Sequence, residues 1–258
     1  MSTIIKIVAS GMQSQQARME AISHNLANVN TPGFKTSRIE FQDKQYVQQK
    51  VTASVGGGSV TADAWVGTGV TASNRTMLSQ GSLIFTGLPT DVAIVGDGFF
   101  PVRLPDGQTG YTRNGAFQTD SQGRLVTADG YPLDPGVQTQ PGTTLRTTDS
   151  GEVQLVNSKG DTMGEAGVIR TVTFINPEGL QPVGKGLYLA TAESGQPNVG
   201  TPGRDGHGKL AAGAMEQSNV SVADEMVNML EAQRAYQVAA KAVSALMEML
   251  QEASSIER

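Results

Sequence analysis

The sequence predicts an α+β protein in which long N- and C-terminal α-helices pair as a coiled-coil-like helical domain. Apolar residues recur at steps of three and four at both ends of the chain, and glycine-containing turn signals recur through its middle. We expect residues 1–35 and 211–258 to form the helical domain and residues 36–76 an extended irregular segment. Residues 77–210 are expected to form an inserted all-β domain.

The N-terminal helix is predicted by an apolar stripe that ends at a turn signal. From Ile5 onward, apolar side chains follow alternating steps of three and four, with Gln15 as the exception. Thr31-Pro32-Gly33 ends the pattern, because proline disfavours helix at the residue before it. The stripe residues expected at a helix interface are Val8, Met12, Met19, Ile22 and Leu26.

Residues 36–76 show no helical period. A glutamine-rich stretch leads into Gly56-Gly57-Gly58, and Gly67-Thr68-Gly69 follows. A segment of this length is too long for a simple hairpin loop, so we expect it to be extended or irregular.

Residues 77–210 have the pattern of short β-strands joined by tight turns. Phe100 and Val102 share one face of a predicted strand while Arg103 lies on the other. Glycine closes most of the turn signals, since these turns need positive φ. The signals are Asp106-Gly107, Asn114-Gly115, Gln122-Gly123, Asp129-Gly130, Pro135-Gly136 and Ser150-Gly151.

The C-terminal helix has the stronger apolar stripe. Ser221 and Asp224 have the spacing of a capping box, and no helix breaker follows. Two paired helices would leave much of this wide stripe bare, so we expect the helices to pack against helices of neighbouring molecules. The alternative is that both helices pack on the β domain. The expected interface residues are Val222, Met226, Met229, Tyr236, Val243 and Leu250.

Composition excludes several classes of function. The chain of 258 residues has no cysteine, which rules out disulfides, thiolate nucleophiles and cysteine-ligated metal centres. Its 19 basic and 24 acidic residues give a net charge of −5, so binding to nucleic acid is not expected. No apolar run reaches the roughly 20 residues that span a bilayer, and we expect no membrane insertion.

No motif indicates a specific chemistry. Residues 203–209 have the spacing of a P-loop, but Leu210 stands where the magnesium-binding Ser or Thr would be. The two histidines, His24 and His207, are far apart in sequence, and the carboxylates are scattered among turns. We therefore predict no enzyme activity, no cofactor, and no catalytic or metal-binding residues. A carbohydrate-binding or enzymatic β domain with oligomerisation helices is the alternative from another class of protein.

The end of the N-terminal helix resembles a family signature. Residues 23–35 read S-H-N-L-A-N-V-N-T-P-G-F-K, similar to the A-N-N-L-A-N-x-x-T-x-G-F-K segment of the flagellar rod and hook family, with His24 in place of an asparagine. We expect the asparagines to lie at the helix C-terminus, where they satisfy free carbonyls or tolerate a left-handed turn. The signature residues are Asn25, Asn28, Gly33 and Phe34.

The resemblance extends over nearly the whole chain. Four segments are similar to the β-domain core of that family, and the C-terminal run looks most like its distal rod members. Proximal rod or hook-type axial members are the alternatives. The similar segments are residues 91–100, 104–107, 111–115 and 123–130 in the β domain, and 218–230 and 233–236 near the C-terminus.

The resemblance implies a self-assembling structural subunit of the bacterial flagellum. In the family, terminal helices stack as the inner tube of the basal-body rod, which crosses the periplasm, transmits torque to the hook and surrounds part of the export channel. The implied partners are further copies of the chain, proximal rod proteins, the hook protein, the P and L ring proteins and the flagellar type III export apparatus. Lys44 to about Val66 corresponds to a segment that braces neighbouring subunits in distal rod members.

The first residues do not have the pattern of a secretory signal peptide. Lys6 interrupts the apolar stretch, and no small-residue cleavage site follows a clear apolar core. We therefore expect export without a cleaved signal peptide, in line with the type III route that the resemblance implies.

Overall fold

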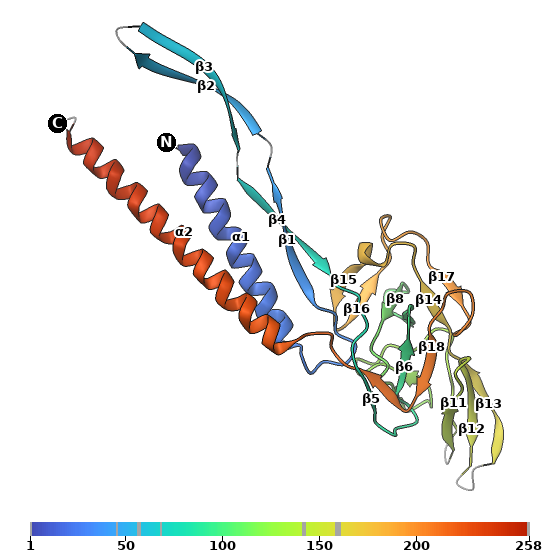
Figure 1. The fold of residues 1–258 in the computed structure, drawn as a ribbon. Coiled ribbons are helices and arrows are strands. Elements are labelled where there is room, and N and C mark those ends of the chain that lie inside the picture. Colours follow the sequence, from blue (N-terminus) through green and yellow to red (C-terminus); the bar gives the residue numbers. More distant parts are fainter. Residues whose placement is uncertain are drawn as a thin grey trace. The chain divides into compact units, whose positions relative to one another are not determined.

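The computed structural model describes residues 2–44, 46–55, 58–67, 69–140, 143–157 and 161–256 (Figure 1). The chain divides into two compact units. The first, called here the helix–ribbon unit, comprises Met1–Leu26, Ser37–Arg75 and Ser221–Arg258. The second, called the β unit, comprises Ala27–Thr36 and Thr76–Val220.

The helix–ribbon unit contains the two long terminal helices that the sequence predicts, α1 (Ser2–Ala27) and α2 (Val222–Ile256). They lie side by side (Figure 1), and Arg18 of α1 forms a 3.3 Å ion pair with Glu231 of α2. The Ser221 hydroxyl accepts a hydrogen bond from the Asp224 N–H at 3.4 Å and so caps the start of α2.

Residues 36–76 form β-strands instead of the predicted irregular segment. Strand β1 (Ser37–Asp43) pairs with β4 (Val70–Thr76). Beyond them, β2 (Tyr46–Val55) pairs antiparallel with β3 (Gly58–Gly67) along their whole length, with Tyr46 opposite Gly67 and Val55 opposite Gly58. The intervening Gly56 and Gly57 lie outside the described residues.

The strands have a physical reason in the sequence. Val47, Val51, Thr52 and Val55 are β-branched, and residues of this kind favour an extended chain. The expectation of irregular structure gave the glutamines and glycines more weight than these β-branched residues.

The β1–β4 ribbon is bonded to α1. The Ser10 hydroxyl accepts a hydrogen bond from the Val70 N–H at 3.2 Å. The Asn25 side chain donates to the Ser37 carbonyl at 2.8 Å and accepts from the Ser37 N–H at 2.9 Å. Asn25 therefore offers β1 the donor and acceptor that a neighbouring strand would offer.

These contacts correct the predicted fold class. The terminal helices do not form a helical domain by themselves, because the strands of residues 36–76 belong to the same compact unit. The two helices also do not cover the whole predicted stripe between them, since Val222 and Met226 are exposed. The rest of the middle of the chain is mostly β.

The β unit consists of short strands in small sheets. One sheet has the order β15-β16-β8-β7 and another β11-β12-β13, while β5 pairs with β19, β6 with β18, β9 with β10 and β14 with β17. Pro177–Gly179 forms one turn of 3₁₀-helix. The bounds are β5 Leu83–Phe85, β6 Val92–Val95, β7 Phe100–Arg103, β8 Thr109–Thr112, β9 Gln118–Thr119, β10 Leu125–Val126, β11 Thr144–Thr147, β12 Glu152–Val156, β13 Thr162–Val168, β14 Thr171–Thr173, β15 Gln181–Gly184, β16 Leu187–Leu189, β17 Asn198–Gly200, β18 Lys209–Ala212 and β19 Ala214–Glu216.

Two apolar clusters form the core of the β unit. The larger one includes Phe100 and Val102, which are fully buried as the strand pattern predicts. The smaller one is aromatic: the Phe174 ring packs edge-on against Phe99 and Tyr111, with centroid distances of 6.0 and 4.9 Å. Edge-to-face pairs of this kind stabilise a core beyond the area they bury.

Candidate assembly surface

One face of α2 is covered within the helix–ribbon unit. Ala232 is completely buried and Glu225 nearly so, while Met229, Tyr236 and Val243 are half-buried at the same helical spacing. Arg18 donates to Asn228 and Glu231, both at 3.3 Å, which places α1 against this face. We call it the inner face of α2.

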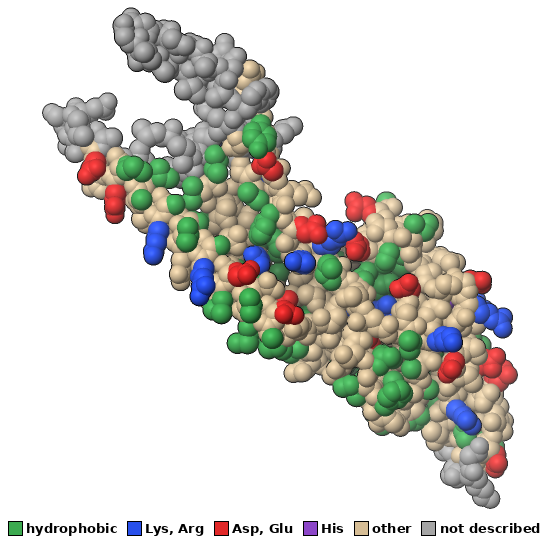
Figure 2. All heavy atoms as spheres, in the orientation of Figure 1, with side chains coloured by type: hydrophobic (Ala, Val, Ile, Leu, Met, Phe, Trp, Pro, Cys, Tyr) green, Lys and Arg blue, Asp and Glu red, His purple; other side chains and the backbone are tan. Residues whose placement is uncertain are grey.

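The other side of α2 carries several exposed apolar side chains, with Arg234 between Leu230 and Val238. Figure 2 shows hydrophobic side chains along this helix. Exposed apolar side chains that gather along one side of a helix mark an interaction site. We call this set the outer stripe: Val222, Met226, Val227, Leu230 and Val238 are 43%, 58%, 57%, 56% and 68% exposed.

The predicted stripe on α2 is divided between these two surfaces. Met229, Tyr236 and Val243 belong to the inner face, whereas Val222 and Met226 belong to the outer stripe. The side chain of Leu250 lies outside the described residues. The apolar period of the sequence predicted one stripe on α2. It could not show which of these residues face α1 and which are exposed.

On α1, the predicted stripe is mostly covered. Ile22 is buried, Val8, Met12 and Met19 are half-buried, and Leu26 is exposed at 37%.

The apolar pattern of the sequence did not identify Glu225 and Ala232 as part of the covered face of α2. A charged residue and a small residue do not stand out as members of an apolar stripe.

Glu225 is an unusual residue for a helix interface. Its Oε2 has no hydrogen-bond partner among the described residues. Burial raises the pKa of its carboxyl, a hydrogen bond with Asn25 and the charge of Arg18 oppose the rise, and the charge of Asp224 adds to it. Folding therefore makes it harder to ionise this carboxyl than an exposed glutamate.

We predict that Glu225→Gln stabilises the protein at pH 7. A raised folded-state pKa gives stability that is complete below the ordinary value of 4.5 and is lost as pH rises through the raised pKa. Melting followed by circular dichroism should therefore show a higher Tm for the variant at pH 7, by about 2–4 °C for each kcal/mol gained, and no difference below pH 4.5. Glu248→Gln, on the exposed part of α2, is the control. A pH dependence of the same size in parent and Glu225→Gln would contradict this assignment.

The signature residues lie where the chain leaves α1. Asn28 Oδ1 accepts a hydrogen bond from the Thr31 hydroxyl at 3.1 Å, and Phe34 is half-buried. Asn25 is buried at 1% and bonds to Ser37, as described above, so its side chain serves a strand. The left-handed residue is Gly33, with φ of +69°.

Beside the signature lies a buried cluster of charged side chains in the β unit. The Lys35 ammonium donates to Glu216 Oε1, and neither side chain has exposed surface. The Arg113 guanidinium is 3.9 Å from Glu216 Oε2 and lies 5.4 Å from the Phe99 ring centre. Burial lowers the pKa of Lys35 and of Arg113, and in both the charge of Glu216 opposes that effect.

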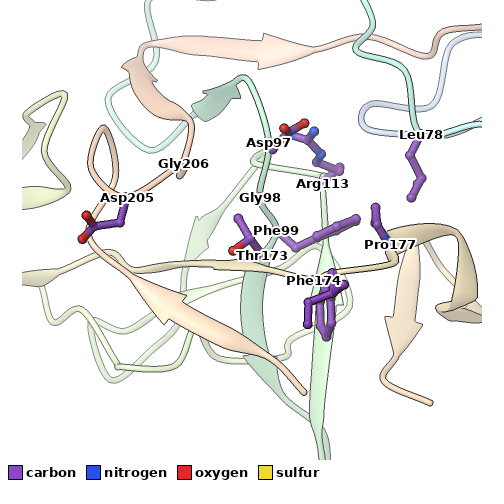
Figure 3. Close-up of a pocket in the computed structure, with 11 residues that line it drawn as sticks. Leu78, Asp97, Gly98, Phe99, Arg113, Thr173, Phe174, Pro177, Asp205 and Gly206 are labelled. Carbon is purple, nitrogen blue, oxygen red and sulfur yellow. The ribbon is translucent and has the colours of Figure 1, made fainter. Parts of the chain in front are cut away.

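A pocket of about 380 Å³ opens next to this cluster. In Figure 3, Phe99 and Phe174 lie close together, and Asp97 lies beside Arg113. The pocket has no nucleophile paired with a base, and the described part of the chain has no group of three or more His, Asp or Glu side chains placed to hold a metal. Its residues are Leu78, Asp97, Gly98, Phe99, Arg113, Thr173, Phe174, Ile175, Pro177, Asp205 and Gly206.

Neither helix is long and apolar enough to cross a membrane, within the residues that the structure describes.

Family models match the same elements that form these surfaces. The model described as "Flagella basal body rod protein" matches residues 5–35, and "Flagellar basal body rod FlgEFG protein C-terminal" matches 211–256. "Flagellar hook protein FlgE/F/G D1 domain" matches residues 93–155. The first two ranges contain most of α1, the whole signature segment and all of α2.

Curated relatives extend the similarity to nearly full length. The flagellar basal-body rod protein FlgG of Buchnera aphidicola subsp. Schizaphis graminum is 41% identical over 254 residues, covering 97% of this chain and 98% of the relative. The FlgG proteins of Borreliella burgdorferi and Caulobacter vibrioides are 41% and 38% identical, and each alignment covers at least 97% of both chains. The chain belongs to the flagellar basal-body rod protein family.

The similarity to a hook protein covers less of the chain than the similarity to the rod proteins. The flagellar hook protein FlgE of Helicobacter mustelae is 45% identical over 127 residues, which is 47% of this chain and 28% of the hook protein. The rod relatives are therefore similar in overall organisation, and the hook protein only in part.

Proposed function

We propose that this chain is a structural subunit of the distal rod of the bacterial flagellum. Many copies would build a tubular shaft that crosses the periplasm, transmits torque from motor to hook and surrounds part of the export channel. Similarity to basal-body rod proteins over nearly the full length supports this function. The single structural observation that carries it is the outer stripe of α2, which the described residues of its own unit leave exposed.

The outer stripe is suited to contact between copies. Full burial of one Val, Leu or Met side chain contributes about 1.5–3 kcal/mol, so each half-exposed member adds about 1 kcal/mol when a neighbour covers it. A contact between two different surfaces of identical subunits repeats along a helical assembly. The proposed interface residues are those of the outer stripe, with Leu26 of α1 as a further exposed member.

The partners follow from the position in the flagellum. We propose contacts with proximal rod proteins, the hook protein and the P and L ring proteins, and passage through the flagellar type III export apparatus. Rod identity is favoured over hook identity because the hook relative matches less than half of the chain. The proposed mechanism is mechanical packing without catalysis.

Electron microscopy of basal bodies tests this function. Cells that lack the chain should yield basal bodies without a distal rod and hook, and expression of the chain should restore both. Complete rods and hooks in cells that lack the chain would contradict the proposal.

A further inference from the structure

The chain passes between the two units after Leu26, Thr36, Arg75 and Val220. On the β-unit side, these crossings belong to three segments: residues 27–36, the residues from 76 to 81, and the residues from 216 to 220. Force that travels along the covalent chain into the β unit must enter through these segments.

A buried ion pair joins all three segments. Lys35 Nζ donates to Glu216 Oε1 and, at 2.7 Å, to the Ser79 carbonyl. The Gly81 N–H donates to the same Glu216 Oε1 at 2.9 Å. Glu216 Oε1 therefore links residues 216–220 to both residues 27–36 and residues 76–81.

Asn219 joins the same three segments a second time. Its Oδ1 accepts from the Thr36 N–H at 2.8 Å and from the Thr36 hydroxyl at 2.6 Å. Its Nδ2 donates to the Met77 carbonyl at 2.9 Å and to the Ser79 carbonyl at 3.1 Å. We call Lys35, Thr36, Glu216 and Asn219, with these backbone partners, the neck network.

Backbone hydrogen bonds run parallel to these side-chain bonds. The Gly33 N–H donates to the Glu216 carbonyl and the Met77 N–H to the Thr36 carbonyl, both at 2.8 Å. No segment can slide past another without breaking several directional bonds at once.

Stability alone is a poor explanation for this arrangement. The cost of removing two charges from water offsets most of their attraction, and a packed apolar pair of similar volume is often as stable. Hydrogen-bonded charges differ from an apolar pair in fixing direction, because such bonds weaken steeply when bent. Resistance to sliding is what the neck network adds.

We propose that the neck network is the mechanical joint through which torque enters the β unit, an inference that rests on the proposed rod function. Lys35, Glu216 and Asn219 are positioning residues, which keep the three segments in register under load. Weakening the network should therefore leave the rod assembled but lower the load that it carries.

Asn219→Ala in the full chain is the test, because it removes side-chain bonds to two segments without leaving an unpaired charge. Hydrogen exchange of the Thr36 and Met77 amides in the purified protein should accelerate at least about tenfold, the factor that corresponds to 1.4 kcal/mol. The mutually bonded Phe99 and Val172 amides, in the core, should not change. Asn198→Ala is the matched control, because the Asn198 side chain donates a long 3.4 Å hydrogen bond to the Thr173 hydroxyl at an exposed position.

Motor performance in cells gives the second readout. Cells with Asn219→Ala should form rods and hooks visible by electron microscopy, swim normally in dilute medium and stop at a lower viscosity than the parent or the Asn198→Ala control. If Asn219→Ala prevents rod formation, Thr36→Val, which removes only the hydroxyl bond, takes its place in the same assay.

Either readout can overturn the proposal. Unchanged exchange at Thr36 and Met77 would show that the network does not hold these segments. Accelerated exchange in rods that sustain the load of the parent would show that it holds them without carrying torque. Both results leave rod and hook formation intact, so they are distinct from failure of the proposed function, in which cells lacking the chain still build complete rods.

Discussion

Leu230→Asp is expected to abolish rod assembly while the isolated subunit stays folded. Leu230 lies in the outer stripe and is 56% exposed, so the carboxylate of the introduced aspartate stays hydrated in the monomer. In the assembly the same carboxylate would be buried against apolar neighbours, at a cost of several kcal/mol. The critical concentration for assembly should rise by more than ~100-fold, which corresponds to about 2.7 kcal/mol. Sedimentation of assembled material and circular dichroism of the monomer measure the two effects.

Two variants separate the outer stripe from the inner face. Leu230→Met keeps the site apolar at similar volume and should assemble like the parent. Tyr236→Asp places a charge on the half-buried inner face, and should lower the Tm of the monomer itself. Assembly of Leu230→Asp at the concentration that suffices for the parent would remove the outer stripe from the interface.

Gly33→Ala is expected to destabilise the β unit by about 3 kcal/mol or more. Gly33 has φ of +69°, a region that costs an L-residue of order 1–3 kcal/mol. A Cβ at this position would also lie 2.5 Å from the Asn114 nitrogen and 2.7 Å from the Arg113 carbonyl carbon. Both atoms belong to the backbone and cannot rotate away. Urea unfolding of the purified protein measures the loss.

Gly107→Ala is the matched control for the backbone angle. Gly107 has φ of +83°, and among the described residues no atom beyond Gly107 and its two chain neighbours lies within 4 Å of the position that a Cβ would take. It should cost only the conformational strain, so Gly33→Ala should be clearly the worse of the two. Equal losses would mean that the close approach of Asn114 adds nothing.

Local rules predicted the terminal helices and many of the turns. A long apolar period with a cap at Ser221 leaves little alternative to helix, and the glycine of Asp106-Gly107 adopts the positive φ that its turn requires. Gly115 in the Asn114-Gly115 signal is also required to be glycine, but for a different reason. A Cβ on Gly115 would collide with the Val92 carbonyl oxygen. The turn pattern therefore predicts a glycine at position 115 but not the steric reason for it.

The structure of residues 36–76 depends on tertiary contacts that the sequence pattern does not show. The ribbon of residues 36–76 exists because its strands pair with each other and bond to α1 through Ser10 and Asn25. Neither residue differs in sequence from an ordinary polar residue on an exposed helix face. Only the family signature, which contains Asn25, gave a signal, and it assigned the side chain to the helix end.

The buried charges were the least predictable part of the candidate site. Lys35 and Glu216 are 181 positions apart and have the composition of ordinary surface residues. Lysine and glutamate are almost never fully buried unless paired, and pairing over such a distance has no local signature. The position of Lys35 at the end of the family signature was the one available indication.

The exposure of the outer stripe in free and assembled protein tests the central claim most directly. The chain has no cysteine, so Leu230→Cys introduces a single thiol that maleimide can label without background. We expect rapid labelling in the monomer and strong protection in assembled rods, while a cysteine in place of the 65%-exposed Met163 of β13 serves as a reference on another surface. Labelling of Leu230→Cys in rods at the rate seen in the monomer would show that the outer stripe faces solvent there, and would contradict the account.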